Sequence, residues 1–329
     1  MTSHGASERL GMILVFLTAC LWGTSGTAAA FVPELGAVAV GAVAMGGGGL
    51  LQAAVNARPV RAAWPGLLRR WPTLLVGGIC VFVYPLCFFG SMRVGGVALG
   101  TVVSLASAPL FSALIERVVE GRALSTRWTV SCLLGIAGTV ALALSRSESS
   151  HADALPGEHA SAWGVGLGLL AGVTYAGFSY AMRRLMNQGI PRGASAGGVM
   201  GLGGVLLLPV AAFAVPSVLD HPDTLLVLGY LVLVPQFLGY VLFSRGLKLV
   251  DSSTATTSTL LEPAVATVLA VAVLAEPITA IGWIGIGVLA AALATLMAPT
   301  RRRRSDSVDR RRVNGATAGP VATDEEVDA

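Results

Sequence analysis

Residues 251–263 read Asp-Ser-Ser-Thr-Ala-Thr-Thr-Ser-Thr-Leu-Leu-Glu-Pro, and an apolar run then extends to Ala275. The whole segment is long enough to cross a bilayer, which takes about 20 helical residues. Glu262 falls near its middle, where a carboxylate costs roughly 3 kcal/mol and normally faces a bundle interior or a water-filled cavity. The segment therefore predicts a membrane-spanning helix with a functional face.

This segment also carries seven hydroxyl side chains between Ser252 and Thr259. Helical spacing places Ser252, Ala255, Ser258 or Thr259, and Glu262 on one face, which predicts a polar stripe from one membrane surface to the middle. Pro263 has no amide hydrogen, so in a regular helix the carbonyl of Thr259 loses its usual partner, which is tolerated where the backbone lines a cavity. Hydroxyls can instead join helices, but Glu262 favours a translocation pathway that includes Pro263.

Composition excludes an ordinary soluble domain. The 329 residues are 54% hydrophobic and 12% charged, with a mean hydropathy of +0.74, whereas soluble domains carry about 25% charged residues. The apolar runs are too long and too uniform for barrel strands. The four cysteines lie in apolar runs without a CxxC pair, which indicates neither a disulfide framework nor a metal site, and no cofactor is expected.

The chain is predicted to be an all-α integral membrane protein with ten transmembrane helices. The expected spans are 11–32, 36–56, 71–91, 95–117, 127–146, 161–183, 195–216, 224–245, 251–275 and 280–298. The expected organisation is a cytoplasmic tail (1–10), a first five-helix repeat (11–146), an extracytoplasmic loop (147–160), a second five-helix repeat (161–298) and a disordered basic and acidic tail (299–329).

The distribution of basic residues predicts the orientation. With the N-terminus inside, 20 of the 22 Lys and Arg residues fall in inner segments, and only Arg93 and Arg146 fall outside. This asymmetry predicts a multi-pass protein of the cell membrane with both termini cytoplasmic, and the net charge of +4 does not indicate nucleic-acid binding. Leu17-Thr18-Ala19-Cys20 is similar to a lipoprotein cleavage box, but cleavage would leave nine spans, so an uncleaved first span is favoured.

A weak internal repeat relates the two halves. At an offset of 154 residues, Pro109 aligns with Pro263 and Ser104 with Ser258. Each half has five spans, so the second half enters the membrane with the opposite orientation. Inverted repeats whose broken helices meet near mid-membrane are typical of secondary transporters, which predicts alternating access.

Glycines and prolines within the predicted spans indicate close helix packing and kinks. Gly164, Gly168 and Gly172 share one face of the sixth span, which predicts close helix packing. Pro85 and Pro235 interrupt the third and eighth spans. Kinks at these prolines are expected and can act as hinges.

These motifs resemble the EamA family of the drug/metabolite transporter superfamily. The resemblance rests on two five-span halves with Leu21-Trp22-Gly23, Ala108-Pro109-Leu110 and Leu261-Glu262-Pro263 in spans one, four and nine. It implies an inverted-repeat carrier of the cytoplasmic membrane, often an exporter of metabolites or amino acids, with spans one, three, four and six and their counterparts lining the cavity. The chain departs from a regular repeat because Glu120 follows Pro109 by two residues fewer than Glu276 follows Pro263.

Several residues are candidates for the substrate pathway. Glu262 is the first, as a substrate-contacting or proton-carrying group, although it could instead be a hydrogen-bonded strut. Aromatic side chains in membranes often serve packing or the interface, yet some here sit well inside their spans. The further candidates are Trp22, Tyr84, Tyr175, Gln236, Ser104 and Pro109.

The predicted function is secondary transport, with export of a small organic metabolite or amino acid. The partners expected are this solute and membrane lipid, with proton antiport and passive facilitation left open. A non-transporting membrane scaffold or sensor is the alternative. A membrane-embedded enzyme is disfavoured because no span contains histidine and no HExxH, GxSxG or Walker motif is present. The substrate, direction of flux and oligomeric state are open.

Overall fold

The computed structural model describes residues 3–121, 123–146, 158–274 and 278–298. These residues form helices joined by turns, with no strand among them. Ten helical segments in the described ranges are long and apolar enough to cross a membrane. The all-α prediction and the number of spans are therefore confirmed. The predicted tail after residue 298, Glu276 and most of the loop before the sixth span lie outside the described residues.

The first half contains five long helices and two short ones. They are α1 (Ser3–Ala29), α2 (Ala37–Val55), α3 (Ala57–Ala62), α4 (Trp64–Arg69), α5 (Trp71–Gly95), α6 (Val97–Glu120) and α7 (Thr126–Arg146). The segment 57–70, which connects the second and third predicted spans, forms α3 and α4.

The second half repeats this order with more interruptions. It contains α8 (Glu158–Asn187), α9 (Arg192–Ala212), α10 (Val215–Asp220), α11 (Thr224–Leu231), a π-helical segment (Val232–Leu238), α12 (Gly239–Leu247), α13 (Ser252–Ser258), a 3₁₀ turn (Thr259–Leu261), α14 (Glu262–Leu274) and α15 (Ala280–Met297). The eighth and ninth spans are therefore broken. A proline lies at each break.

Helix pairing within residues 3–297 relates the two halves. Helix α5 packs on α8 and α1 packs on α12, so the third span of each half contacts the first span of the other. In the same way α6 packs on α8 and α14 on α1, while α2 pairs with α9 and α7 with α15. Each contact has a counterpart, as expected for two repeats.

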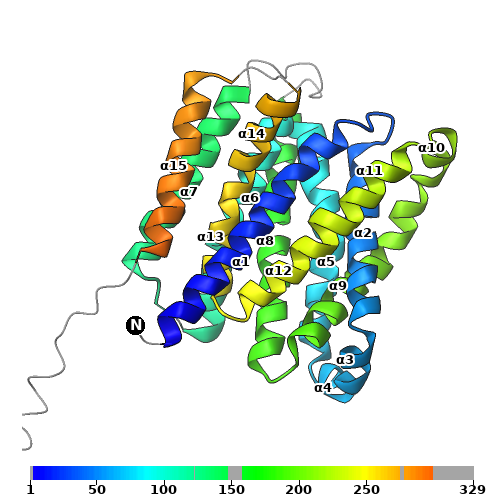
Figure 1. Ribbon diagram of the computed structural model, residues 1–329, viewed down its shortest axis with the longest axis vertical. Helices are drawn as coiled ribbons and strands as arrows, with labels where there is room; N and C mark the ends of the chain where they lie inside the picture. Colours follow the sequence, from blue (N-terminus) through cyan, green and yellow to red (C-terminus); the bar gives the residue numbers. More distant parts are fainter. Residues whose placement is uncertain (1–2, 122, 147–157, 275–277, 299–329) are drawn as a thin grey trace, which may run out of the picture. The chain divides into compact units, whose positions relative to one another are not determined.

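One end of the helical bundle holds the short helices α3 and α4, the N-terminus of α1 and the link between α12 and α13 (Figure 1). Residues 58–70, 183–192 and 245–248 lie there and carry most basic side chains of the described chain. We call this the basic end. It matches the side that the distribution of Lys and Arg predicts to be cytoplasmic.

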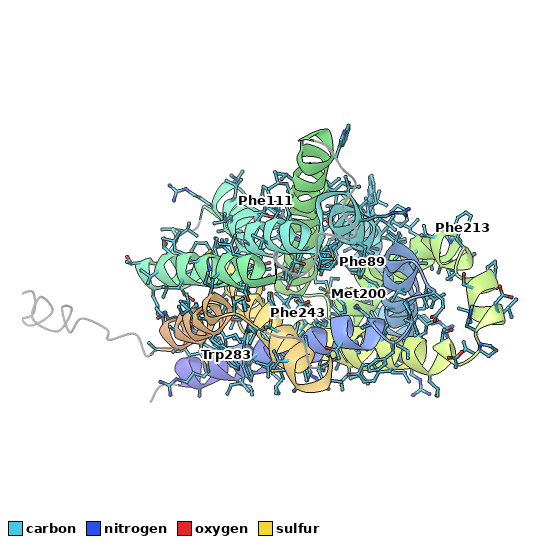
Figure 2. The ribbon with its side chains drawn as sticks, turned by 90° about the horizontal axis from the view of Figure 1, so that it is seen from above. Phe89, Phe111, Met200, Phe213, Phe243 and Trp283 are labelled. Atoms are coloured by element: carbon cyan, nitrogen blue, oxygen red, sulfur yellow. The ribbon has the colours of Figure 1, made fainter. Side chains whose placement is uncertain are left out.

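Apolar side chains occupy both the interior and the periphery of the bundle. Phe243 and Met200 are fully buried, whereas Phe213 is 82% exposed and Trp283 54% exposed. Figure 2 shows the first pair among the helices and the second pair at the outer edge. An apolar periphery suits contact with lipid chains, because in lipid such surface needs no burial.

Glycines allow α8 to approach α5 and α6 closely, as its sequence predicted. A Cβ atom on Gly164 would lie 2.5 Å from the Cα atom of Gly95, and one on Gly172 would lie 3.0 Å from the carbonyl oxygen of Ser104. Both obstacles are backbone atoms. Larger residues would therefore separate these helices.

Replacing Gly204 by alanine should destabilise the α2–α9 pair. The new Cβ atom would lie 2.8 Å from the carbonyl oxygen of Gly46 and 3.0 Å from the amide nitrogen of Leu50. Overpacking of this kind typically costs about 1–3 kcal/mol, so thermal unfolding in detergent should begin at a lower temperature. Gly229→Ala in α11 is the control, since no atom lies within 4 Å of its Cβ. Equal effects of the two changes would contradict the prediction.

Candidate functional site

The ninth span is broken at the position of Glu262 and Pro263. Helix α13 ends at Ser258, a 3₁₀ turn covers Thr259–Leu261, and α14 begins at Glu262. The amide of Glu262 donates to the carbonyl oxygen of Thr259. The carbonyl that Pro263 would leave unpaired in a regular helix is satisfied here, because the tighter turn supplies the Glu262 amide as its donor. Glu262 thus lies at a helix start in mid-span.

Three of the six hydroxyl side chains of α13 serve the backbone of their own helix. Those of Thr256, Thr257 and Ser258 donate to carbonyl oxygens one turn back, at 2.7–2.9 Å. Ser258 and Thr259 are buried. Of the polar stripe expected along this helix, the Ser258 hydroxyl donates locally, whereas the Ser252 hydroxyl is buried without a hydrogen-bond partner among the described residues.

The hydroxyl of Thr259, in the 3₁₀ turn, connects two elements. It lies 2.9 Å from the carbonyl oxygen of Thr256 and 2.7 Å from the Tyr175 hydroxyl. Since Thr259 has one hydroxyl hydrogen, Tyr175 donating to Thr259 satisfies all three groups. The broken span is thereby joined to the middle of α8.

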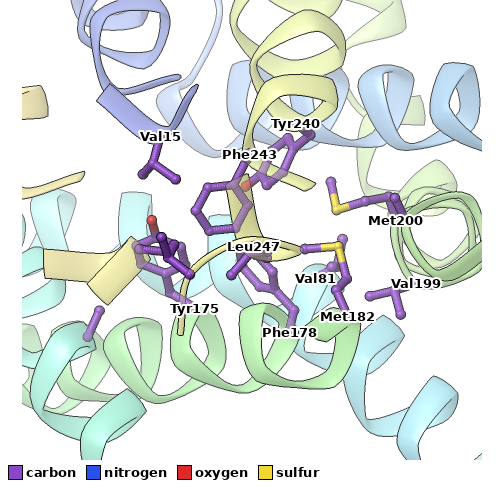
Figure 3. Packing of buried hydrophobic residues seen from close by; sticks show 14 of the residues in the cluster. Val15, Val81, Tyr175, Phe178, Met182, Val199, Met200, Tyr240, Phe243 and Leu247 are labelled. Carbon is purple, nitrogen blue, oxygen red and sulfur yellow. The ribbon is translucent and has the colours of Figure 1, made fainter. Parts of the chain in front are cut away.

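Aromatic rings from four helices gather beside this break. Trp22 of α1 lies 4.9 Å from Tyr240 and 6.0 Å from Tyr175, and Tyr84 of α5 lies 5.5 Å from Tyr175, between ring centroids. Figure 3 shows Tyr175, Phe178, Tyr240 and Phe243 converging from α8 and α12. We call this the aromatic cluster, and its members are Trp22, Tyr84, Tyr175, Phe178, Tyr240 and Phe243.

Glu262 stands next to the cluster without a partner of its own. Its carboxylate is within electrostatic range of the hydroxyls of Tyr84, Tyr175 and Tyr240. No hydrogen bond or ion pair of this side chain occurs among the described residues, and the side chain remains half-buried. An isolated carboxylate in mid-membrane is costly. The alternative of a hydrogen-bonded strut therefore has no support from these contacts.

The eighth span contributes a second irregularity, at Pro235. Three side chains of α1 and α2 donate to carbonyl oxygens in and just after the π-helical segment. These bonds run from Trp22 to Pro235 (3.0 Å), from Gln52 to Phe237 (2.9 Å) and from Thr18 to Gly239 (3.2 Å). Side-chain donors of the first repeat therefore bind backbone carbonyl oxygens of the second repeat near Pro235, where the proline disturbs the helical hydrogen bonds.

The remaining candidates are less well placed. Gln236 has a buried side-chain oxygen without a partner among the described residues, and it lies against α2 at Gly48. Ser104 and Pro109 are buried in α6, where Ser104 faces Gly172 of α8. None of these three residues belongs to the aromatic cluster, so their assignment to the substrate pathway stays a prediction.

Two charged contacts at the basic end were not anticipated from the sequence. Glu116 of α6 accepts from the amide of Ser253 (3.2 Å) and from its hydroxyl (2.6 Å). Arg183 of α8 donates to the carbonyl oxygen of Leu247 (2.8 Å), to that of Val250 and to the carboxylate of Asp251. Glu116 lies inside a predicted span, as Glu262 does, and that signal could have identified it.

Comparison with known proteins identifies the family. A family model described as the EamA-like transporter family matches residues 9–144 and 162–298. The chain belongs to the EamA-like transporter family. It is therefore a multi-pass membrane transporter built from two repeats, with a small-molecule solute as its partner.

Two further similarities agree with this family. The "Uncharacterized transporter YwfM" of Bacillus subtilis (strain 168) is 29% identical over 297 residues, which is 89% of this chain and 95% of that protein. A solved structure described only as "Crystal structure of protein" matches with a TM-score of 0.69 at 20% identity, over 92% of this chain and 98% of that one. The second similarity concerns the fold alone.

Proposed function

We propose that this EamA-like transporter exports a small organic metabolite or amino acid by alternating access. The observation that carries the proposal is the half-buried Glu262 carboxylate, which has no described partner at the break of a span. Such a group normally marks a solute or proton pathway. The aromatic cluster lies beside the same break, and Tyr84, its half-buried member, is the ring that a solute could contact without displacing the others.

The contacts between repeats support alternating access by rocking. The cluster joins α1 and α5 of the first repeat to α8 and α12 of the second. At the basic end, Glu116 ties α6 to Ser253 of α13, again across the two repeats. Carriers of this kind expose a central site by moving one bundle against the other. Opening the basic end would require this contact to break.

The membrane and orientation complete the proposal. We place the protein in the cell membrane with both termini and the basic end in the cytoplasm, because the Lys and Arg residues gather there. Export then starts from the basic end. Glu262 exchanges solute for a proton in this scheme, which makes transport proton-coupled. Passive facilitation is the competing mechanism, and it needs no titrating group.

Export is tested by comparing solutes in the medium and in cell extracts. Cells that overproduce the native chain should accumulate one solute class outside, relative to cells with an empty vector, because an exporter lowers the internal pool. Mass spectrometry of both compartments is the measurement. An unchanged medium together with a raised internal pool would contradict export and indicate import.

A further inference from the structure

The short helices α3 and α4 form a folded surface at the basic end, between the second and third spans. We call residues 57–71 the basic platform. On its inner side, Val60 and Ala63 pack against the main hydrophobic cluster, and Leu67 is fully buried in that cluster. A Cβ atom on Gly197 of α9 would lie 3.0 Å from a methyl group of Val60, so α3 rests directly on α9. One side of the platform is therefore fixed to the helical bundle.

The other side of the basic platform exposes large apolar side chains. Trp64 is 48% exposed, Leu68 is 50% exposed and Trp71 is 58% exposed. Trp rings gather where a membrane meets water, because one end of the ring is apolar and its N–H group prefers a polar surrounding. Trp71 is also the first residue of the third spanning segment. The platform therefore lies at the level where the hydrocarbon core meets the lipid headgroups.

Three guanidinium groups of the basic platform have no protein partner. Arg58, Arg61 and Arg69 are exposed, and their side chains make no hydrogen bond or ion pair among the described residues. Arg58 and Arg61 are three residues apart in α3, so both leave the helix on the same side. Residues 57–76 contain no Asp or Glu. The positive charge on this surface is therefore not neutralised by the platform itself.

A fourth arginine, Arg70, holds the platform in place. Its guanidinium donates to the carbonyl oxygen of Gly66 at 3.2 Å and to that of Gln188 at 2.8 Å. The second bond joins the end of α4 to the turn that follows α8. Together with the packing of α3 on α9, it fixes the platform to the second repeat, so the three free guanidinium groups project from an ordered surface.

The corresponding segment of the second repeat provides an internal comparison. Helix α10 follows the seventh span and lies at the opposite end of the bundle from α3 and α4 (Figure 1). Phe213 and Leu219 are exposed there, so this segment also presents apolar side chains. Its charges are reversed, because residues 213–223 carry Asp220 and Asp223 and no Lys or Arg. Exposed apolar surface is common to both segments, and charge complementary to phosphate distinguishes the basic platform.

We propose that the basic platform binds the phosphate groups of anionic phospholipids through Arg58, Arg61 and Arg69. The rings of Trp64 and Trp71 lie at the depth of the lipid glycerol groups in this arrangement. Guanidinium groups bind phosphate oxygens through paired hydrogen bonds. Each basic residue near an anionic surface strengthens binding about fivefold. This site is separate from the proposed solute pathway and goes beyond the proposed function, because it is the same for either direction of transport.

Photo-crosslinking of lipids to the full-length chain in vesicles tests the inference. Phosphatidylcholine vesicles receive a small, equal fraction of phosphatidylglycerol or phosphatidylcholine that carries a photoactivatable group close to the phosphate. Peptide mass spectrometry gives the ratio of phosphatidylglycerol to phosphatidylcholine adducts on residues 57–71 and, as a reference in the same molecule, on residues 213–223. The ratio on the platform should exceed the reference ratio about fivefold. Both leaflets have the same composition, so the orientation of the protein in the vesicle does not affect the result.

Two triple variants separate the platform from the general charge of the basic end. The variant Arg58→Gln, Arg61→Gln, Arg69→Gln should lower the platform ratio to the reference ratio. The control removes three other exposed charges of the basic end and should leave the platform ratio unchanged; its substitutions are Arg117→Gln, Arg245→Gln and Lys248→Gln. Lysine at the three platform positions keeps the charge and should keep most of the preference, which separates loss of charge from misfolding.

Three results would overturn the inference. The first is an equal ratio on the platform and on residues 213–223 of the native chain. The second is a preference that survives glutamine at all three platform positions. The third is an equal loss in both triple glutamine variants, which would show that net charge at the basic end attracts the lipid. None of these results alters the test of export, because that test measures solutes in the medium and in the cell.

Discussion

Glu262→Gln should reduce solute flux through the purified protein in liposomes on the order of 100-fold, near the upper range of coupling between two ligands of one protein. Glutamine has nearly the same size as glutamate but cannot carry a proton or a negative charge. It therefore removes both the proposed exchange and the solute contact. The measurement is flux driven by a pH gradient, with the native chain and the variant at equal protein density.

The control for this change is Glu34→Gln, which alters an exposed carboxylate outside the described spans. It should transport as the native chain does. Residual flux of Glu262→Gln should no longer respond to the pH gradient. If flux and its dependence on the gradient both survive in Glu262→Gln, the site assignment is wrong, while membership of the transporter family stands.

Arg183→Met should produce the largest loss of stability. The Arg183 side chain is 11% exposed and holds the carbonyl oxygens of Leu247 and Val250 together with Asp251, whose side chain is 38% exposed. Removing one partner of a buried ion pair costs about 3–5 kcal/mol, and the exposure of Asp251 places this case at the lower limit, about 3 kcal/mol. Thermal unfolding of the detergent-solubilised protein measures the loss.

The neighbouring residue Arg184 is the matched control. Its guanidinium donates to the Tyr180 hydroxyl at 3.0 Å and lies 5.9 Å from the centroid of that ring, within one helix. Arg184→Met should therefore cost less than about 1 kcal/mol. If both variants unfold at the same temperature, the tie between α8 and the α12–α13 link does not stabilise the fold in the way proposed.

The contacts of Arg183 also connect the basic end to the proposed solute site. Arg183 and Glu116 both hold the start of α13, the first from α8 and the second from α6. Helix α13 leads directly to the break at Glu262. A movement of α13 at the basic end would therefore reach the proposed solute site through seven residues of helix and one 3₁₀ turn.

The number and nature of the spans could be predicted from the sequence because both depend on local properties. A run of apolar residues long enough to cross a bilayer forms a helix wherever it lies in the chain. The predicted span 224–245 matches the described segment Thr224–Leu247 closely, although a π-helical segment interrupts it. The type of irregularity at Pro235 depends on packing against α1 and α2, which sequence position does not reveal.

The candidate site was predicted in part. Trp22, Tyr84, Tyr175 and Glu262 were selected separately, by their depth in four different spans, and the structure brings them to one place. Ser104 and Pro109 were selected by the internal repeat, and they lie outside the aromatic cluster. Sequence symmetry relates positions in two halves, but it does not require both positions to face the same site.

The sequence by itself determined the membrane class, the ten spans, the pseudo-repeat and the loss of one backbone donor at Pro263, because hydrophobicity, length and a missing amide act within a few residues. Only the tertiary structure decided which side chains meet. Ser253 and Glu116 are 137 residues apart, and Tyr175 and Thr259 are 84 apart. Such pairs form only when whole helices pack, and packing depends on the summed fit of many side chains.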